Sequence, residues 1–322
     1  MDSKQKTVIV VDCDHENIDP ERAVLKDSFG EPRWLKCRTE DEVIAQCGEG
    51  DGLIIQYAPM TRRVLEKLPR CKAIVRLGVG VDTVDLRAAA DLGIVVCNVP
   101  DYGTNEVSDH ALALMLCLTR KLVRANALTK AGRWDCSLMK PIFRHQVQTV
   151  GIVGLGRIGR AMAHKTQALG MTVLGCDPYV SPGDLPDYVS LTGLDDLLRR
   201  ADVVSIHCPL TEETRHLIDE KRLALMKPTA YLVNTARGNI VDEAALDRHL
   251  AAGKLAGAAM DVLAKEPGAA DHPLFRHENF IATPHMAWYS EESARELKRK
   301  AAEEVRSVLL GEAPRYQVNK FQ

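Results

Sequence analysis

Short apolar runs rich in β-branched residues recur along the chain, separated by segments in which hydrophobic positions follow a helical spacing. They lie at residues 8–11, 53–55, 74–75, 94–96, 150–153, 173–174, 203–206, 231–233 and 258–261. Continuous apolar runs of this length are typical of strands buried on both faces, and their alternation with helices favours parallel sheets joined by crossover connections. The pattern therefore predicts an α/β protein.

One long helical pattern, starting near Asn105, divides the predicted strands into two groups. Its apolar positions, spaced by three and four residues, are Val107, Ala111, Leu114, Met115, Leu118 and Leu122. A length of 322 residues exceeds what one hydrophobic core usually organises, so we expect two domains. The helix itself is expected either to be an ordinary core helix or to pack between domains or against a second subunit.

Two further segments lie outside the strand pattern. Residues 131–148 are irregular and carry large apolar side chains, among them Trp134 and Phe143, which predicts an arm that a second copy covers in a dimer. Residues 290–310 follow a helical pattern with a Ser-Glu-Glu start and end at Gly311. Because this helix comes after the second strand group, we expect it to return to the first domain.

Composition and charge narrow the classes of protein. The chain is 46% hydrophobic and 27% charged, and its formal net charge of −2 supplies no basic field for nucleic acid. Nine cysteines without CxxC spacing indicate reduced thiols, with neither a disulfide framework nor a zinc site. The start of the chain is too short and too charged for a signal peptide, and Arg120 interrupts the richest apolar stretch. We expect a cytoplasmic protein without metal or membrane partner.

A glycine-rich fingerprint, G-x-G-x-x-G, directly follows the apolar run at 150–153 and opens a helical pattern. The predicted cofactor-binding residues here are Gly154, Gly156, Arg157, Ile158 and Gly159. Gly154 permits a tight turn, Gly156 lets the backbone approach a pyrophosphate, and Gly159 allows the helix to pack closely on the strand. The helix N-terminus then supplies amide donors and partial positive charge.

An acidic residue ends the strand that follows this helix. Asp177 lies eighteen residues after Gly159, close to the spacing at which an acid meets the ribose of adenosine. A carboxylate there accepts hydrogen bonds from the ribose diol and repels a 2′-phosphate, which favours NAD over NADP. The alternative is a turn residue before Pro178. Together with the glycines, Asp177 predicts NAD (NADH) as cofactor.

Three charged residues, Arg237, Glu266 and His285, follow apolar runs in the second half of the chain. Ligands of open α/β sheets bind outside the carboxyl ends of the strands, so these side chains are expected to converge beside the nicotinamide. Arg237 can bind a carboxylate or polarise a carbonyl, His285 can exchange a proton with a hydroxyl, and Glu266 can orient the His285 ring. Each alone has an ordinary structural explanation; their order after the fingerprint predicts a hydride-transfer site.

Together these segments resemble the D-isomer-specific 2-hydroxyacid dehydrogenase family. The resemblance rests on the glycine fingerprint and on residues 76–82, 235–238, 261–267 and 283–285, and covers nearly the whole chain. It implies two Rossmann-like domains with parallel sheets, in which a nucleotide-binding domain is inserted into a split substrate domain. The implied bounds are 1–102 and 290–322 for the substrate domain and 103–289 for the NAD-binding domain. The resemblance also implies a homodimer formed through the nucleotide-binding domains.

The resemblance assigns roles to individual residues. Arg237, Glu266 and His285 would form the catalytic trio, with Asp261 near the nicotinamide carboxamide. Further implied cofactor contacts are His207, Pro209, Thr235 and Ala236. The implied substrate-carboxylate loop contains Arg76, Gly78, Val79 and Gly80.

Within the family, residues 98–100 and 285–291 resemble the C-terminal binding proteins, although Val79 stands where those proteins usually carry Ser. The leading interpretation is an NAD(H)-dependent oxidoreductase that interconverts a 2-oxo acid and its (R)-2-hydroxy acid. One alternative is an NAD(H)-sensing dimeric scaffold that binds peptides, as corepressors do. A second is 3-phosphoglycerate dehydrogenase, which shares the trio and Arg76.

Trp288 lies three positions past His285 and is the residue expected to select the substrate side chain. An indole there would line the pocket with an apolar face, which favours a flexible or sulfur-containing side chain over a phosphate. The alternative is a core tryptophan that anchors the start of the last helix.

Overall fold

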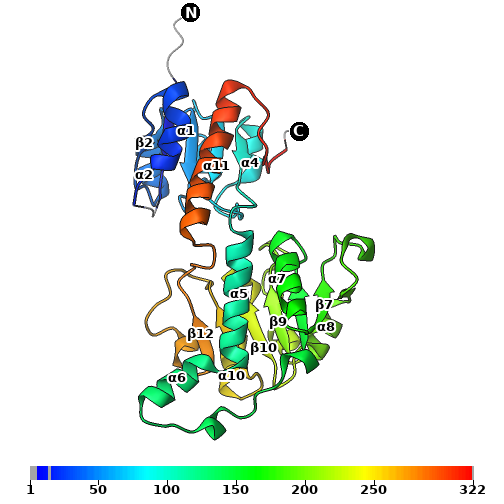
Figure 1. Ribbon diagram of the computed structural model, residues 1–322. Helices are drawn as coiled ribbons and strands as arrows, with labels where there is room; N and C mark the ends of the chain where they lie inside the picture. Colours follow the sequence, from blue (N-terminus) through cyan, green and yellow to red (C-terminus); the bar gives the residue numbers. More distant parts are fainter. Residues whose placement is uncertain (1–5, 14–15, 321–322) are drawn as a thin grey trace, which may run out of the picture. The chain divides into compact units, whose positions relative to one another are not determined.

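The computed structural model describes residues 6–13 and 16–320 and divides into two compact units. One unit comprises Met1–Gly103 with Ser290–Gln322, and the other comprises Thr104–Tyr289. The first five residues, on which the expectation about a signal peptide depends, lie outside the described residues. Both units contain parallel sheets with helices between the strands, which confirms the predicted α/β class (Figure 1).

The first unit contains a five-stranded parallel sheet in the order β2-β1-β3-β4-β5. The strands are β1 (Val8–Val10), β2 (Arg33–Trp34), β3 (Gly52–Ile55), β4 (Ala73–Arg76) and β5 (Val95–Cys97). The helices are α1 (Asp19–Phe29), α2 (Glu40–Cys47), α3 (Arg62–Leu65), α4 (Leu86–Asp91) and α11 (Glu291–Leu310). The order reverses between β1 and β3, so the ligand crevice expected of such a sheet lies at their carboxyl ends.

The last helix, α11, packs against α1 within this unit, although the two are far apart in sequence (Figure 1). Its N-cap is Ser290, whose side chain accepts a hydrogen bond from the Ser293 amide, and its C-cap is Gly311 with a φ of 82°. Both ends are those predicted from the sequence, because a serine cap and a left-handed glycine are local signals.

The second unit contains a seven-stranded parallel sheet in the order β12-β11-β10-β9-β6-β7-β8. Its strands are β6 (Thr149–Val153), β7 (Thr172–Cys176), β8 (Val189–Leu191), β9 (Val203–Ile206), β10 (Tyr231–Asn234), β11 (Gly257–Met260) and β12 (Phe280–Ala282). Its α-helices are α5 (Thr104–Thr119), α6 (Leu122–Lys130), α7 (Arg157–Ala168), α8 (Leu194–Arg200), α9 (Glu220–Leu223) and α10 (Glu243–Ala251). Its short 3₁₀ helices are η1 (Cys136–Met139), η2 (His145–Val147), η3 (Pro182–Asp184), η4 (Gly238–Ile240) and η5 (Pro273–Arg276). The order reverses between β6 and β9, which is where a Rossmann sheet binds a dinucleotide.

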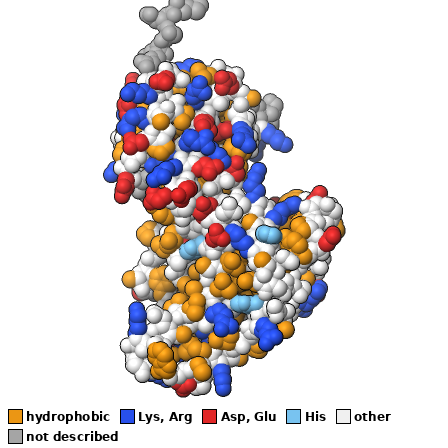
Figure 2. Space-filling model, viewed as in Figure 1, with side chains coloured by type: hydrophobic (Ala, Val, Ile, Leu, Met, Phe, Trp, Pro, Cys, Tyr) orange, Lys and Arg blue, Asp and Glu red, His pale blue; other side chains and the backbone are white. Residues whose placement is uncertain are grey.

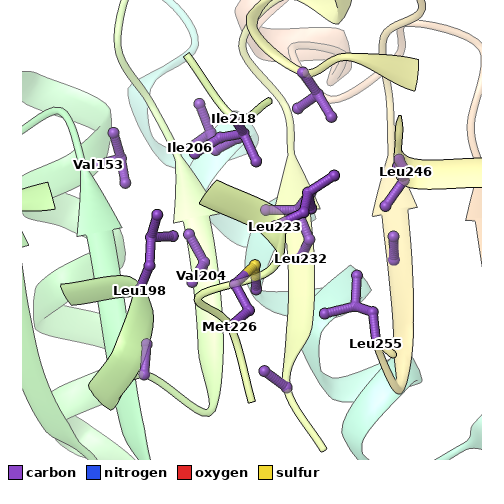
Figure 3. Packing of buried hydrophobic residues seen from close by; sticks show 14 of the residues in the cluster. Val153, Leu198, Val204, Ile206, Ile218, Leu223, Met226, Leu232, Leu246 and Leu255 are labelled. Atoms are coloured by element: carbon purple, nitrogen blue, oxygen red, sulfur yellow. The ribbon is translucent and has the colours of Figure 1, made fainter. Parts of the chain in front are cut away.

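Buried side chains cover both faces of the seven-stranded sheet. On one face, Val204 and Ile206 of β9 and Leu232 of β10 meet Leu198 of α8 and Leu246 of α10 (Figure 3). The other face packs against α5 and α7, whose buried residues form a second cluster with β6 and β10. Such double coverage explains why the central strands read as continuous apolar runs.

The long helix predicted from Asn105 is shorter than its hydrophobic pattern. The α5 helix ends at Thr119, and Lys121 adopts a φ of 54°, so that Leu122 begins α6 and is 52% exposed. Leu122 is therefore wrongly included in the predicted apolar face. The remaining face, with Ala111 and Met115, is buried in the core of the second unit, as in an ordinary core helix. Among the residues described, no helix has the length and apolar character required to cross a bilayer.

Candidate active site

The glycine fingerprint forms the turn between β6 and α7. Gly154 has a φ of 91°, and a Cβ there would lie 2.5 Å from the amide nitrogen of Cys208. A Cβ on Gly159 would lie 1.9 Å from the carbonyl oxygen of Gly154. A Cβ on Gly156 would meet no described atom within 4 Å. Two glycines are thus required by close packing, and the third leaves open space at the N-terminus of α7, which fits a pyrophosphate.

Asp177 follows β7 and bonds to the fingerprint directly. Its Oδ2 accepts a hydrogen bond from the Leu155 amide at 2.8 Å, and its Oδ1 accepts one from the Tyr179 amide at 2.9 Å. The bond from the Tyr179 amide is typical of a turn that an aspartate forms before a proline. The bond from the Leu155 amide connects the carboxylate to the glycine-rich loop. Each oxygen keeps a second lone pair that a ribose hydroxyl could use.

His207 and Pro209 follow β9, on the other side of the point where the strand order reverses. The Nε2 of His207 lies 2.8 Å from the hydroxyl of Ser205, and burial lowers the pKa of His207 to about 4. The imidazole is therefore neutral at pH 7. The Pro209 ring is exposed, and its carbonyl accepts a hydrogen bond from Thr214 at 2.7 Å.

Thr235, Ala236 and Arg237 form a turn after β10. The buried side chain of Asn234 shapes this turn, because its Oδ1 accepts from the Ala236 amide at 3.0 Å and its Nδ2 donates to the Arg237 carbonyl at 2.9 Å. Thr235 is 8% exposed, and its Oγ1 has no hydrogen-bond partner among the described residues. A buried hydroxyl without a partner is uncommon and fits a site that a bound group completes.

His285 and Glu266 form a hydrogen-bonded pair. The Nδ1 of His285 lies 2.6 Å from Oε2 of Glu266, while Oε1 of Glu266 accepts from the Leu263 amide at 2.9 Å. Burial alone would raise the pKa of Glu266, but the hydrogen bond and charge of His285, the Leu263 amide and the Arg237 charge lower it overall. Glu266 is thus a carboxylate at neutral pH and accepts the Nδ1 proton. This leaves Nε2 of His285 to exchange a proton with a substrate.

Asp261 holds the backbone beside His285. Its Oδ1 accepts from the Thr283 hydroxyl at 2.5 Å and the Met286 amide at 3.0 Å, and its Oδ2 accepts from the Ala287 amide at 2.9 Å. The Asp261 carbonyl also accepts from the His285 amide at 2.8 Å. These bonds keep His285 at its left-handed φ of 54°. The contact between Asp261 and a nicotinamide carboxamide stays a prediction.

Sequence reasoning missed two polar contacts at this edge of the sheet. His110 of α5 places Nε2 3.0 Å from the Thr283 hydroxyl and 3.6 Å from Oδ1 of Asp261. Asn234 was likewise not predicted, although it ends the buried strand β10 directly before the Thr235 turn. A polar residue that ends a buried strand is the signal that could have found Asn234. His110 has no such signal.

Trp288 is half-buried and packs edge-on against the neighbouring Tyr289, with ring centroids 5.5 Å apart. It follows Ala287, whose amide is bound by Asp261, so its backbone is held near that of His285. Whether the indole faces a substrate stays a prediction.

The predicted substrate loop follows β4 in the first unit. Gly78 has a φ of 136°, and a Cβ there would lie 1.8 Å from a guanidinium nitrogen of Arg76. The carbonyls of Gly78 and Val79 accept hydrogen bonds from the Val99 amide and the Asn98 side chain, at 3.0 and 2.6 Å. The amides of Gly78, Val79 and Gly80 are used by no hydrogen bond found among the described residues. Consecutive amides of this kind are typical of anion-binding turns.

Known proteins resemble the chain in both sequence and fold. Residues 112–287 match the family model described as D-isomer specific 2-hydroxyacid dehydrogenase, NAD binding domain. The D-3-phosphoglycerate dehydrogenase of Methanocaldococcus jannaschii is 37% identical over 97% of this chain and 59% of its own length. The hydroxypyruvate reductase of Blautia hydrogenotrophica is 35% identical over 87% of this chain and 88% of its own length. The structure of D-lactate dehydrogenase from Aquifex aeolicus, complexed with NAD and lactic acid, superposes with a TM-score of 0.87 at 31% identity, covering 95% of this chain and 96% of that one.

The chain therefore belongs to the D-isomer specific 2-hydroxyacid dehydrogenase family, and its second unit contains that family's NAD-binding domain. The chain spans between half and three-fifths of the length of several phosphoglycerate dehydrogenases that it matches. The narrower resemblance to the C-terminal binding proteins stays a prediction.

Proposed function

We propose that the protein is an NAD(H)-dependent oxidoreductase that interconverts a 2-oxo acid and its (R)-2-hydroxy acid. The observation that carries the proposal is the 2.6 Å hydrogen bond between His285 and Glu266, at the carboxyl edge of a Rossmann sheet. A carboxylate that fixes one imidazole nitrogen leaves the other as a general acid and base. The neighbouring Arg237, whose charge helps to lower the pKa of Glu266, adds the positive charge that a 2-oxo acid requires.

The bound nicotinamide supplies or accepts the hydride in this reaction. In the reducing direction, His285 donates the Nε2 proton to the carbonyl oxygen of the substrate, and in the oxidising direction it removes the hydroxyl proton. The Glu266 carboxylate orients the ring and stabilises the positive charge that His285 carries between the two proton transfers. Arg237 binds the substrate carboxylate or polarises the carbonyl, since a guanidinium can fork onto two oxygens.

The cofactor is held by residues of the second unit. The open space at Gly156 and the amides of Arg157 and Ile158 fit the pyrophosphate, and Asp177 fits the ribose diol. The Thr235 hydroxyl, which has no hydrogen-bond partner among the described residues, is available to the nicotinamide half. We propose NAD rather than NADP because a carboxylate at the ribose repels a 2′-phosphate.

In the first unit, the proposed substrate contact is the turn from Gly78 to Gly80. Its amides are unused among the described residues, and the guanidinium of Arg76 packs against Gly78. A turn of free amides beside a cation has the chemistry that binds a carboxylate.

A panel of 2-oxo acids with NADH, followed by NADH absorbance, tests the proposal directly. Turnover of at least one acid is expected. His285→Ala should then lower kcat by about a hundred- to ten-thousandfold without weakening NADH binding, which is the range for a lost general acid. A kcat near that of the wild type in this variant would remove His285 from the mechanism.

3-Phosphoglycerate dehydrogenase activity is the second candidate, because several relatives bear that name, at 37–40% identity. The same panel separates the two when it includes 3-phosphohydroxypyruvate beside apolar acids such as 4-methylthio-2-oxobutyrate. An apolar pocket wall formed by Trp288 would favour 4-methylthio-2-oxobutyrate over 3-phosphohydroxypyruvate. If no acid turns over and a peptide binds only with NAD(H), the scaffold alternative replaces both.

We further propose a homodimer formed through α6 and residues 131–148. The exposed apolar residues there are Leu122, Val123, Trp134, Phe143 and Val147, and α6 has no buried residue. Figure 2 shows hydrophobic side chains gathered on the visible face of the second unit, whereas that of the first unit is largely charged. Sedimentation should show a dimer that Trp134→Glu with Val147→Asp dissociates; a monomeric wild type would refute the dimer.

A cytoplasmic location is supported by the nine cysteines, none of which forms a disulfide in the part of the chain that the structure describes. Alkylation of protein purified without reductant, followed by mass spectrometry, should modify all nine after denaturation. A disulfide found in that experiment would contradict a reducing compartment.

A further inference from the structure

Glu266 lies on a segment that no hydrophobic core holds in place. Every residue from Ala264 to Asp271 is exposed, and the Glu266 side chain itself keeps 35% of its accessible surface. Water can compete for each hydrogen bond of such a segment, and its backbone is free to move unless other contacts fix it. Yet the 2.6 Å contact between Glu266 and His285 requires sub-ångström placement.

The start of this segment is held by two carboxylates acting on neighbouring amides. Glu266 itself accepts from the Leu263 amide at 2.9 Å, and Glu243 accepts from the next amide, that of Ala264, at 2.7 Å. The Ala264 carbonyl accepts from the side chain of Asn239 at 3.4 Å. Ala264, two residues before Glu266, is therefore held at both its N–H and its C=O.

The end of the segment is tied to the same carboxylate. The Nε2 of His272 lies 3.3 Å from Oε2 of Glu243, whereas Glu243 uses Oε1 for the Ala264 amide. The Nδ1 of His272 accepts from the Leu274 amide at 3.4 Å, so the ring proton belongs on Nε2, which donates to Glu243. The ring also packs against Phe275, with centroids 5.1 Å apart.

Glu243 is suited to this task because it belongs to a rigid element. It is the first residue of α10, whose N-cap Asp242 accepts a hydrogen bond from the Ala245 amide. Its side chain is only 16% exposed, and that of His272 is 17% exposed, so both are far better shielded from water than Glu266. Hydrogen bonds from amides to a carboxylate are charge-assisted and stronger than those between neutral groups.

We propose that Glu243 and His272 are positioning residues, which clamp the two ends of the segment 264–272 so that Glu266 meets Nδ1 of His285. This inference rests on the proposed function, because it assigns the clamp to the acid–base pair of that reaction. The hydrogen bonds described for both residues are with groups of the protein itself. Their effect on the chemistry passes through Glu266.

The test measures the pair itself as well as turnover. The pH midpoint of the His285 Cε1–H resonance is followed by NMR, with His285→Ala to assign it and Glu266→Gln to give the value without the carboxylate. The clamp variants are Glu243→Ala, Glu243→Asp and His272→Ala. The matched control is Glu220→Ala, which removes a carboxylate that contacts Arg248 at 2.6 Å and the His249 ring at 3.4 Å elsewhere in the same unit.

Glu243→Asp separates positioning from helix stability. It keeps a negative charge at the start of α10, where the helix dipole favours one, but its side chain is shorter by one carbon–carbon bond, about 1.5 Å. An aspartate cannot reach both Ala264 and His272. We expect Glu243→Asp to keep the melting temperature of the wild type and still to weaken the contact between Glu266 and His285.

The clamp variants should move the His285 midpoint toward that of Glu266→Gln and lower kcat about ten- to a hundredfold, with KM changed little. Glu220→Ala should leave the midpoint and kcat unchanged. The inference is overturned if Glu243→Ala keeps the wild-type midpoint, or if Glu243→Asp behaves as wild type in both midpoint and kcat. If Glu266→Gln itself leaves the midpoint unmoved, the Glu266–His285 pairing fails and the clamp with it. A moved midpoint in a protein that reduces no 2-oxo acid would reject the proposed function and keep the clamp.

Discussion

Gly238→Ala is the substitution that most directly tests how the site is built. Gly238 is buried, follows Arg237 and begins η4. A Cβ at this position would lie 2.0 Å from the carbonyl carbon of Leu263 and 2.3 Å from both the Leu263 oxygen and the Ala264 nitrogen. These are backbone atoms, so no rotation of a side chain relieves the contact. The two segments must separate.

The size of the separation follows from contact distances. Carbon atoms that are not bonded approach to about 3.5 Å, so the Leu263–Ala264 peptide must shift by roughly 1.5 Å. The Glu266 carboxylate accepts a hydrogen bond from the Leu263 amide and would move with it. This movement stretches the 2.6 Å contact to His285 beyond hydrogen-bond length. A displacement of about 1 Å at a reacting centre costs on the order of a hundredfold in rate. We expect kcat to fall by about that factor, with about 1–3 kcal/mol lost from the free energy of unfolding through overpacking.

Steady-state kinetics on the best 2-oxo acid substrate measure this effect. Fluorescence titration with NADH should give a dissociation constant near that of the wild type, which also shows that the variant is folded. Gly193→Ala is the matched control, because its φ is −68° and a Cβ there would meet no described atom within 4 Å. A Gly238→Ala variant with the kcat of Gly193→Ala would refute the close contact and the reasoning that depends on it.

Three further substitutions test the cofactor site, the first unit and the substrate pocket. Asp177→Ala should weaken NADH binding and reduce the preference for NADH over NADPH, since the 2′-phosphate is no longer repelled. If titrations give an unchanged ratio of the NADH and NADPH dissociation constants, another residue recognises the ribose diol. Burial raises the pKa of Glu21 to about 7, and both its carboxyl oxygens lack hydrogen-bond partners among the described residues. The folded state therefore favours the protonated form, so the free energy of unfolding falls as the pH rises from 4.5 toward 7. Glu21→Gln should remove about 3 kcal/mol of that fall, as measured by urea titrations at pH 5 and 8. If the free energy of unfolding falls between pH 5 and pH 8 by the same amount in Glu21→Gln as in the wild type, this explanation is contradicted. Trp288→Ala should cost about 1–3 kcal/mol in kcat/KM for apolar 2-oxo acids and little for pyruvate, whereas an equal loss on every acid with a lower melting temperature would make Trp288 structural.

The sequence predicts every strand in the interior of the two sheets, and β5 at one edge. The interior strands are covered on both faces, so their side chains are mostly apolar. The two strands without an apolar run, β2 and β8, lie at sheet edges. Arg33 and Trp34 of β2 are exposed, and Ser190 of β8 is exposed between two half-buried neighbours. Edge strands are defined by their neighbour in the sheet, which a single segment of sequence does not contain.

The end of α5 shows a second limit. The apolar spacing continues from Leu118 to Leu122, but Lys121 takes a left-handed φ between them and the helix stops. The residues on either side are good helix formers, and nothing local announces the break. The start and end of α11 were predictable because Ser290 and Gly311 are themselves the capping residues.

The candidate site divides in the same way. The fingerprint glycines could be predicted with their separate roles because all their constraints lie within one strand, turn and helix. The pairing of Glu266 with His285 could be expected because the carboxyl ends of parallel strands share one edge of the sheet. Glu243 and His272 could not, since in the sequence they are an acid at a helix start and a histidine before a proline. Only folding of the intervening chain onto α10 brings them together.

Glu266 and His285, the proposed acid–base pair, lie on two loops, after β11 and after β12, and each loop is held by an acid that contacts backbone amides. Asp261 accepts from the amides that follow His285, and Glu243 accepts from an amide that precedes Glu266. Amide-to-carboxylate bonds hold a loop without requiring it to bury apolar side chains, so the site can stay open to substrate and still be ordered. The residues between the anchors, 267–271, then contribute chain length and turn geometry more than contacts. Loss of either anchor would leave His285 and Glu266 present and their separation uncontrolled, so the geometry of the proposed site depends on two carboxylates to which the proposed mechanism assigns no proton transfer.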